Sequence, residues 1–157
     1  MEAAARQAST RPLLKVKLGG KGDKERITAV RRGAPEALLI VDANEAWDET
    51  TIDTNLEACE RAGVKLIEQP LPAIRDELLG EIKRTIPFCA DESAQDRASL
   101  KKIVGRYDAI NIKPDKAGGL TEALKLTEAA KACGLGIMVG CMVGTPLAIA
   151  PAMLLFR

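Results

Sequence analysis

Short apolar runs alternate with amphipathic segments along the chain, and each run ends at a polar or glycine-rich turn. The runs predict six strands, at Leu14–Leu18, Leu38–Asp42, Val64–Glu68, Pro87–Ala90, Ala109–Lys113 and Leu135–Val139. The segments between and after them predict helices near Lys24–Arg32, from Asp48 or Thr50 to Ala62, and near Ile74–Arg84, Asp96–Val104, Leu120–Cys133 and Pro146–Leu155. Strands that alternate with helices predict parallel βαβ units.

The composition of the strands indicates where they lie. Three are almost continuously apolar, which is typical of parallel strands buried on both faces: Leu38–Val41, Val64–Ile67 and Gly136–Val139. The first strand differs, because Lys15 and Lys17 share one face while Leu14, Val16 and Leu18 share the other. If the apolar face packs on the helices, both lysines point into the interior of a barrel.

Composition excludes several classes of protein. The 157 residues are 46% hydrophobic and 29% charged, which fits a globular protein with one core, and no linker or low-complexity tract divides them. A net charge of +1 and an aromatic content of 3% argue against a nucleic-acid partner. We find no membrane span or signal peptide and expect a cytoplasmic protein. Four cysteines without a C-x-x-C pair predict mostly buried, reduced thiols rather than structural zinc: Cys59, Cys89, Cys133 and Cys141.

Five of the six predicted strands end at a residue suited to metal or acid/base chemistry. These residues, at intervals of 25, 26, 23 and 22, are Lys17, Asp42, Glu68, Asp91 and Lys113, whereas the sixth run ends at Gly140. In (β/α)8 barrels the carboxyl ends of the strands meet at the active site. The series would therefore bring three carboxylates and two lysines together, as a site for a divalent metal flanked by two bases.

Each of these residues also has a structural interpretation. The two lysines of K-x-K could lie on a solvated strand face, Asp42 could cap a turn, and Glu68 could pair with a surface cation. Trp47 could form a wall of the site or cover the edge of the core. The dipeptide Gly118-Gly119 favours a plain turn over a phosphate site. The regular recurrence at strand ends is what favours the joint, functional interpretation.

Five motifs resemble a known family: DANEAW, IEQPLP, ADES, NIKPDKAGGLTEAL and MVGCMVGT. From about Arg11 onward the chain resembles the enolase superfamily, in its mandelate racemase/muconate lactonizing enzyme subgroup, and within it the dipeptide epimerases of the L-Ala-D/L-Glu type. The resemblance implies a TIM-type (β/α) barrel and a Mg²⁺ cofactor held by Asp42, Glu68 and Asp91. It also implies that Lys17 and Lys113 are acid/base catalysts on opposite faces of a dipeptide substrate.

The chemistry of such an isomerase agrees with these residue types. Removing a proton beside a carboxylate places a second negative charge on its oxygens, and a metal held by carboxylates stabilises that charge. A lysine base must be neutral although a lysine ordinarily titrates at about 10.4. We assign Lys15 an auxiliary role, because its charge beside Lys17 lowers the pKa of a neighbouring lysine. Two lysines on opposite faces give a 1,1-proton transfer through an enolate with inversion.

The chain also departs from the family pattern. A complete barrel has eight strands in about 250 residues, whereas six are predicted here, without the first strand, the eighth strand or the α+β capping domain. We interpret residues 1–10 as an N-terminal tail from the end of a truncated helix, and residues 11–157 as a partial barrel domain. The chain contains no histidine, which disfavours the branch with a histidine base. We expect the isolated chain to be inactive.

Two alternatives remain open at this stage. The same lysines and metal could serve an o-succinylbenzoate synthase or a muconate cycloisomerase. Alternatively, the chain could be a catalytically silent α/β module that self-associates, because an unclosed parallel sheet leaves unpaired edges.

Overall fold

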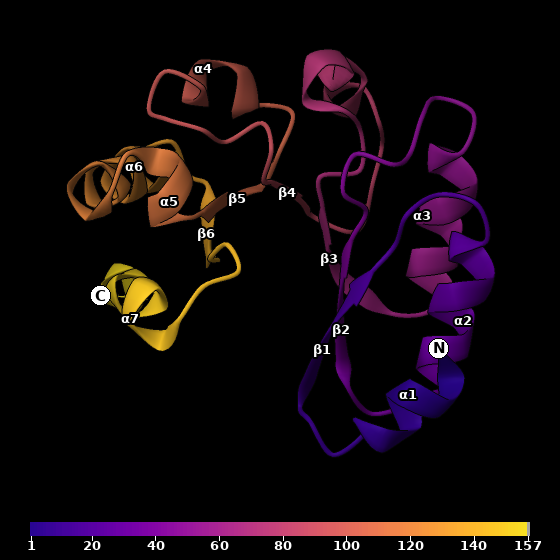
Figure 1. Ribbon diagram of the computed structural model, residues 1–157. Helices are drawn as coiled ribbons and strands as arrows, with labels where there is room; N and C mark the ends of the chain where they lie inside the picture. The colour runs from indigo at the N-terminus through magenta and orange to yellow at the C-terminus, as the bar shows by residue number, and fades with distance from the viewer. Residues whose placement is uncertain (157) are drawn as a thin grey trace. The chain divides into compact units, whose positions relative to one another are not determined.

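The computed structural model describes residues 1–156 and contains parallel strands that alternate with helices in chain order (Figure 1). The strands are β1 (Leu13–Lys17), β2 (Leu38–Asp42), β3 (Val64–Glu68), β4 (Phe88–Ala90), β5 (Ala109–Ile112) and β6 (Gly136–Val139). The chain divides into two compact units: the first comprises residues 1–76 and 82–88, and the second comprises residues 77–81 and those from Cys89 onward. The interpretation of residues 11–157 as one barrel domain stays a prediction.

In the first unit, β1, β2 and β3 pair in parallel, and their last residues are in register: Lys17 opposite Asp42, and Asp42 opposite Glu68. The helices α1 (Glu2–Gln7), α2 (Asp23–Gly33) and α3 (Ile52–Arg61) cover one side of these strands (Figure 1). The apolar side chains that fill this interface include Val16, Leu39, Val41, Ile67 and Ile27.

The two faces of β1 behave as the sequence predicts. Val16 and Leu18 are buried, whereas the side chains of Lys15 and Lys17 keep 36% and 66% of their surface exposed. Because successive side chains of a strand alternate between its faces, both lysines lie on the face away from the buried Val16 and Leu18. The register of the strands places Asp42 and Glu68 beside Lys17 on this face.

In the second unit, β4, β5 and β6 pair in parallel. The helices are α4 (Leu100–Ile103), α5 (Pro114–Ala117), α6 (Leu120–Ala132) and α7 (Pro146–Ile149), and a 3-10 helix, η3, spans Ala150–Phe156. Strand β5 is buried at every residue, whereas β6 is only half-buried. The prediction that Gly136–Val139 is buried on both faces is therefore wrong: among residues 1–156, β6 is an edge strand that pairs only with β5.

Three predicted helices differ from the observed ones. The segment Ile74–Arg84 forms two 3-10 turns, η1 (Ala73–Arg75) and η2 (Glu77–Gly80), because Pro72 and Gly80 leave too short a stretch to nucleate an α-helix. The helix expected at Pro146–Leu155 gives way to η3 beside Pro151, which lacks the N–H that an α-helix needs. The helix predicted at Asp96–Val104 is reduced to α4.

Burial separates the four cysteines into two pairs. Cys59 and Cys89 are buried, and burial raises the pKa of the Cys59 thiol to about 12. Cys133 and Cys141 are exposed, so the prediction of mostly buried thiols holds for only half of them. None of the four forms a disulfide within the described chain. Across residues 1–156, the helices are all too short or too polar to span a lipid bilayer.

Candidate active site

In the first unit, the carboxyl ends of β1, β2 and β3 carry two lysines and two carboxylates. Asp42 and Glu68 are the last residues of β2 and β3, and only 1% and 0% of their surfaces are exposed. Parallel pairing continues past them, because Leu18 N–H donates to the Asp42 carbonyl at 2.8 Å and Ala43 N–H donates to the Glu68 carbonyl at 3.0 Å. The backbone pairing therefore holds Asp42 and Glu68 side by side at the carboxyl ends of their strands.

Both lysines of β1 contact these carboxylates. Lys15 Nζ lies 3.0 Å from Asp42 Oδ2 and also pairs with Glu68 Oε2, so one ammonium group bridges the two acids. Lys17 Nζ donates to Asp42 Oδ2 at 2.6 Å and to Asn44 Oδ1 at 2.9 Å. Burial by itself lowers the pKa of Lys15, but its contacts with Glu68 and Asp42 outweigh burial and raise that pKa above its ordinary value. Lys15 is therefore a fixed positive charge.

Strained backbone follows β2 and β3. Asn44, Glu45 and Gln69 have φ angles of 46°, 63° and 38°, a left-handed region that L-residues other than glycine seldom adopt. Two backbone bonds join the loops, from Glu45 N–H to the Gln69 carbonyl at 2.9 Å and from Trp47 N–H to the Pro70 carbonyl at 3.0 Å. Such strain persists where the surroundings determine the conformation, and it is typical of functional sites.

Trp47 belongs to the core and not to a wall of the site. Only 1% of it is exposed, and its indole Nε1–H donates to Asp23 Oδ2 at 3.0 Å. Asp23 also accepts from Gly19 N–H at 3.1 Å and from Gly20 N–H at 2.7 Å, so it joins the loop after β1 to the loop after β2. Burial opposes ionisation of Asp23, but these hydrogen bonds prevail and lower its pKa below the ordinary value.

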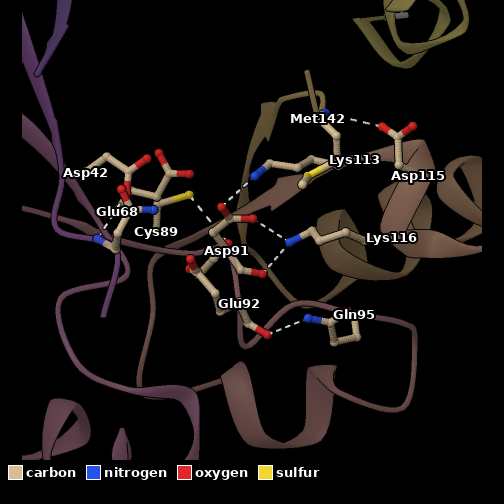
Figure 2. A network of polar contacts seen from close by, with 12 residues as sticks. Asp42, Glu68, Cys89, Asp91, Glu92, Gln95, Lys113, Asp115, Lys116 and Met142 are labelled. Atoms are coloured by element: carbon tan, nitrogen blue, oxygen red, sulfur yellow. Dashed lines mark hydrogen bonds and ion pairs between the residues drawn. The ribbon is translucent and has the colours of Figure 1, made fainter. Parts of the chain in front are cut away.

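In the second unit, Lys113 and Lys116 converge on Asp91, just after β4 (Figure 2). Lys113 Nζ donates to Asp91 Oδ2 at 2.6 Å, and Lys116 Nζ donates to Asp91 Oδ1 and to the Asp91 carbonyl. The Asp91 residue is 3% exposed, and the two lysine side chains are 13% and 16% exposed. Burial raises the pKa of Asp91, but the hydrogen bonds from both lysines outweigh it and lower that pKa overall.

A single turn of helix explains why two lysines reach one carboxylate. Lys113 precedes α5, which Pro114 begins and which ends at Gly118 with a left-handed φ of 87°. Lys116 N–H donates to the Lys113 carbonyl at 2.9 Å, and this turn brings the two lysines to the same carboxylate. Lys116 is not among the residues predicted from the sequence, although the K-x-x-K spacing of Lys113 and Lys116 is visible there. The sequence does not predict α5 either, nor a role for Asn44, which contacts both Lys17 and Asp42.

The five predicted site residues thus fall into two groups, with Lys17, Asp42 and Glu68 in the first unit and Asp91 and Lys113 in the second. Within the described residues, no three His, Cys, Asp or Glu side chains are grouped closely enough to form a metal site. Even so, Asp42 and Glu68 are buried, and a cation, the Lys15 ammonium, already lies between their oxygens. Hard carboxylate oxygens arranged in this way suit Mg²⁺.

Residues 1–156 match the enolase C-terminal domain-like family. The chain is 47% identical to an N-acetyl-D-glutamate racemase from Pseudoalteromonas over 99% of its length and 49% of the racemase. It is also 47% identical to the L-Ala-D/L-Glu epimerase of Escherichia coli, over 90% of this chain and 44% of that protein. The chain therefore spans about half the length of these curated relatives.

Solved structures agree with these relatives. An enolase family member from Agrobacterium tumefaciens superposes with a TM-score of 0.95 and 48% identity, over 98% of this chain and 47% of that one. That protein has homology to dipeptide epimerases, and its structure contains sodium and L-Ala-L-Glu. A dipeptide epimerase from Cytophaga hutchinsonii, complexed with Mg and D-Ala-L-Val, superposes with a TM-score of 0.91 and 28% identity over 98% of this chain and 44% of that one. The predicted α/β class and TIM-type fold are thereby confirmed, and the chain belongs to the enolase C-terminal domain-like family, among relatives that are dipeptide epimerases and racemases.

Proposed function

We propose that the protein containing this chain is a Mg²⁺-dependent isomerase that epimerises a dipeptide of the L-Ala-D/L-Glu type by 1,1-proton transfer. The observation that carries the proposal is that each proposed acid/base lysine contacts a buried carboxylate at a strand end. Lys17 contacts Asp42 at 2.6 Å, and Lys113 contacts Asp91 at 2.6 Å. The 47% identity to the E. coli epimerase supports the choice of substrate class.

The metal would be held by Asp42, Glu68 and Asp91, which are all buried and anionic. When bound, Mg²⁺ supplies positive charge that stabilises the anion formed on the substrate carboxylate as its α-proton leaves. Lys15, whose pKa is raised by its two acidic neighbours, keeps a positive charge beside Lys17. That charge is the auxiliary contribution that we propose for Lys15.

The two catalytic lysines have complementary tasks. One removes the α-proton at its Nζ, and the other returns a proton from the opposite face, which inverts the configuration. Because the roles reverse with the epimer, each lysine is a base for one substrate epimer and an acid for the other.

We further propose that the substrate is a small molecule and that the protein is cytoplasmic, without a nucleic-acid or membrane partner.

The test uses a chimera in which this chain replaces the matching segment of the E. coli epimerase. Proton NMR in D2O with Mg²⁺ would follow the α-proton of L-Ala-L-Glu and L-Ala-D-Glu. We expect the chimera to convert either epimer into the other, and the 157-residue chain alone to show negligible activity, because six strands cannot close an eight-stranded barrel. A folded, Mg²⁺-loaded chimera that leaves both dipeptides unchanged would refute the proposed function.

A second function has a specific observation in its favour. The chain is as similar to an N-acetyl-D-glutamate racemase as it is to the dipeptide epimerase, with 47% identity in each case. An N-acetylated glutamate presents the same α-proton beside a carboxylate, so the same lysines could serve. Assaying the chimera with N-acetyl-D-glutamate beside the dipeptides separates the two functions by their kcat/KM values. Parallel assays for dehydration or cycloisomerisation products would reveal a related lyase.

A further inference from the structure

Gly140 follows β6 and lies directly against the end of β5. A Cβ atom added at this position would lie 2.5 Å from Asn111 Oδ1, 3.0 Å from Asn111 Nδ2 and 3.0 Å from Lys113 Cε. The backbone of Gly140 is not in the left-handed region, so the conformation itself does not require glycine. Its N–H donates to the Ile112 carbonyl at 3.0 Å, which fixes how close the two strand ends are. The missing side chain therefore matters for space and not for backbone strain.

The two neighbours of Gly140 would respond differently to a side chain. Asn111 is 1% exposed and lies within β5, so its side chain is enclosed by the protein. Lys113 has a flexible stem, and its Nζ contacts Asp91 Oδ2 at 2.6 Å. A methyl group at position 140 would push the Lys113 stem at Cε, one bond from that nitrogen. The ammonium group would then move away from Asp91.

We propose that Gly140 is a positioning residue for Lys113: the absence of a side chain lets the Lys113 stem lie against the end of β6 and places its ammonium on Asp91 Oδ2. The placement stands on contacts within the second unit alone. Its importance for catalysis rests on the proposed function, in which Lys113 transfers the α-proton. Figure 2 shows Lys113 reaching Asp91 from the side of β5 and α5.

Gly136, at the start of β6, provides a matched control. A Cβ atom there would lie 3.3 Å from Ala109 Cβ and 3.5 Å from the Asp108 carbonyl, and no atom of Lys113 is among its nearest neighbours. Gly136→Ala therefore adds the same methyl group beside β5 without touching the Lys113 stem. Any general cost of a methyl group against β5 should appear in both variants.

The first experiment measures the position of Lys113 in the 157-residue chain. The rate of reductive methylation of Lys113 is followed by peptide mass spectrometry, with the exposed Lys125 as an internal reference. We expect slow modification in the parent, where the Lys113 side chain is 13% exposed and paired. Gly140→Ala should accelerate modification several-fold relative to Lys125, and Gly136→Ala should not. Equal rates in Gly140→Ala and the parent would overturn the inference.

A further variant covers the case in which Gly140→Ala fails to fold because of Asn111. The double variant Gly140→Ala/Asn111→Ala removes the contact with the Asn111 amide and keeps the contact with Lys113 Cε. We expect it to fold and still to show rapid modification of Lys113, whereas Asn111→Ala alone should protect Lys113 as the parent does. Protection of Lys113 in the folded double variant would refute the inference.

The second experiment introduces the same changes into the chimera with the E. coli epimerase. Gly140→Ala should lower kcat on the order of 10²-fold, the effect of a misplacement of about 1 Å, with a smaller change in KM. Rapid modification of Lys113 with undiminished kcat would support the positional inference and refute the catalytic role of Lys113. Lost activity with Lys113 still protected would refute the positional inference.

Discussion

The two units place a lysine on a strand-end carboxylate by different means. In the first unit, Lys17 lies on an open strand face with 66% of its side chain exposed, and only its contacts with Asp42 and Asn44 fix its ammonium. In the second unit, Lys113 is 13% exposed and lies between the turn of α5 and the bare backbone of Gly140. Lys17 is therefore held by polar contacts alone, whereas Lys113 is held by an ion pair with Asp91 and also by packing, so Lys17 should be more sensitive to salt and Lys113 to steric change.

The largest expected effect comes from removing either lysine. In the chimera, Lys17→Ala and Lys113→Ala should each abolish epimerisation, because inversion needs both a base and an acid. Each variant should still exchange the α-proton of one epimer with solvent, and the two variants should retain opposite epimers. Deuterium incorporation measured by NMR decides this point. Exchange of the same epimer by both variants would contradict the assignment to opposite faces.

The next effect concerns the metal. Asp91→Asn in the chimera should weaken Mg²⁺ binding, because it removes one of three anionic ligands. Loss of a residue that only contacts a metal ligand lowers metal affinity roughly 10–100-fold, so the loss of a ligand itself should cost at least as much. Isothermal titration calorimetry measures the affinity. Asp53→Asn, at an exposed carboxylate of α3, is the control and should bind as the parent does. Parent-like affinity in Asp91→Asn would remove this residue from the metal site.

A smaller effect is expected from removing Lys15, the auxiliary lysine of the first unit. Lys15 lies between Asp42 and Glu68 and thus competes with a metal for their oxygens. Lys15→Met should therefore strengthen Mg²⁺ binding, by about tenfold at most because the side chain is partly exposed to solvent. Lys125→Met, which removes a cation paired with Glu122, should leave the affinity unchanged. Weaker binding in Lys15→Met would mean that Lys15 organises the carboxylates more than it competes for them.

The smallest effect is a pH dependence of stability in the first unit. The pKa of Asp23 is lowered in the folded state, so its ionised form contributes stability above the unfolded pKa of about 3.9. That contribution is lost as the pH falls through the lower, folded pKa. Trp47 is the only tryptophan and contacts Asp23, so its fluorescence reports unfolding at this point. Asp23→Asn should be less stable than the parent at neutral pH, and its stability should depend less on acid pH. Asp53→Asn should have the stability of the parent and the same dependence on pH.

The strands were the most predictable part of the fold. The bounds of β2 and β3 are those predicted, because in each strand a largely apolar run gives way to an acidic residue, Asp42 or Glu68, at the start of a turn. Helices were less predictable where local breakers compete with apolar spacing, as between Pro72 and Gly80. Burial of β6 was mispredicted because strand composition does not report whether a neighbouring strand covers the second edge.

The site was predictable at the level of residue type and strand end, but not at the level of contacts. The recurrence of Lys17, Asp42 and Glu68 at strand ends indicated that they would meet; in the first unit Lys17 contacts Asp42, and Lys15 joins Asp42 to Glu68. The roles of Lys116 and Gly140 depend on the turn of α5 and on the separation between strands, which no local pattern encodes. A glycine at the end of a strand predicts only a turn when the residues that pack against it are not known.

The division of the cysteines by exposure has a practical consequence for spectroscopy. Cys141 is exposed and directly follows Gly140, and Cys133 is exposed at the end of α6, while Cys59 is buried and its pKa is raised to about 12. In a Cys133→Ser background, a maleimide spin label or fluorophore should therefore react at Cys141 in preference to the buried thiols. The chain thus carries a native attachment point one residue from Gly140, where a probe could report displacement of the Lys113 stem in real time.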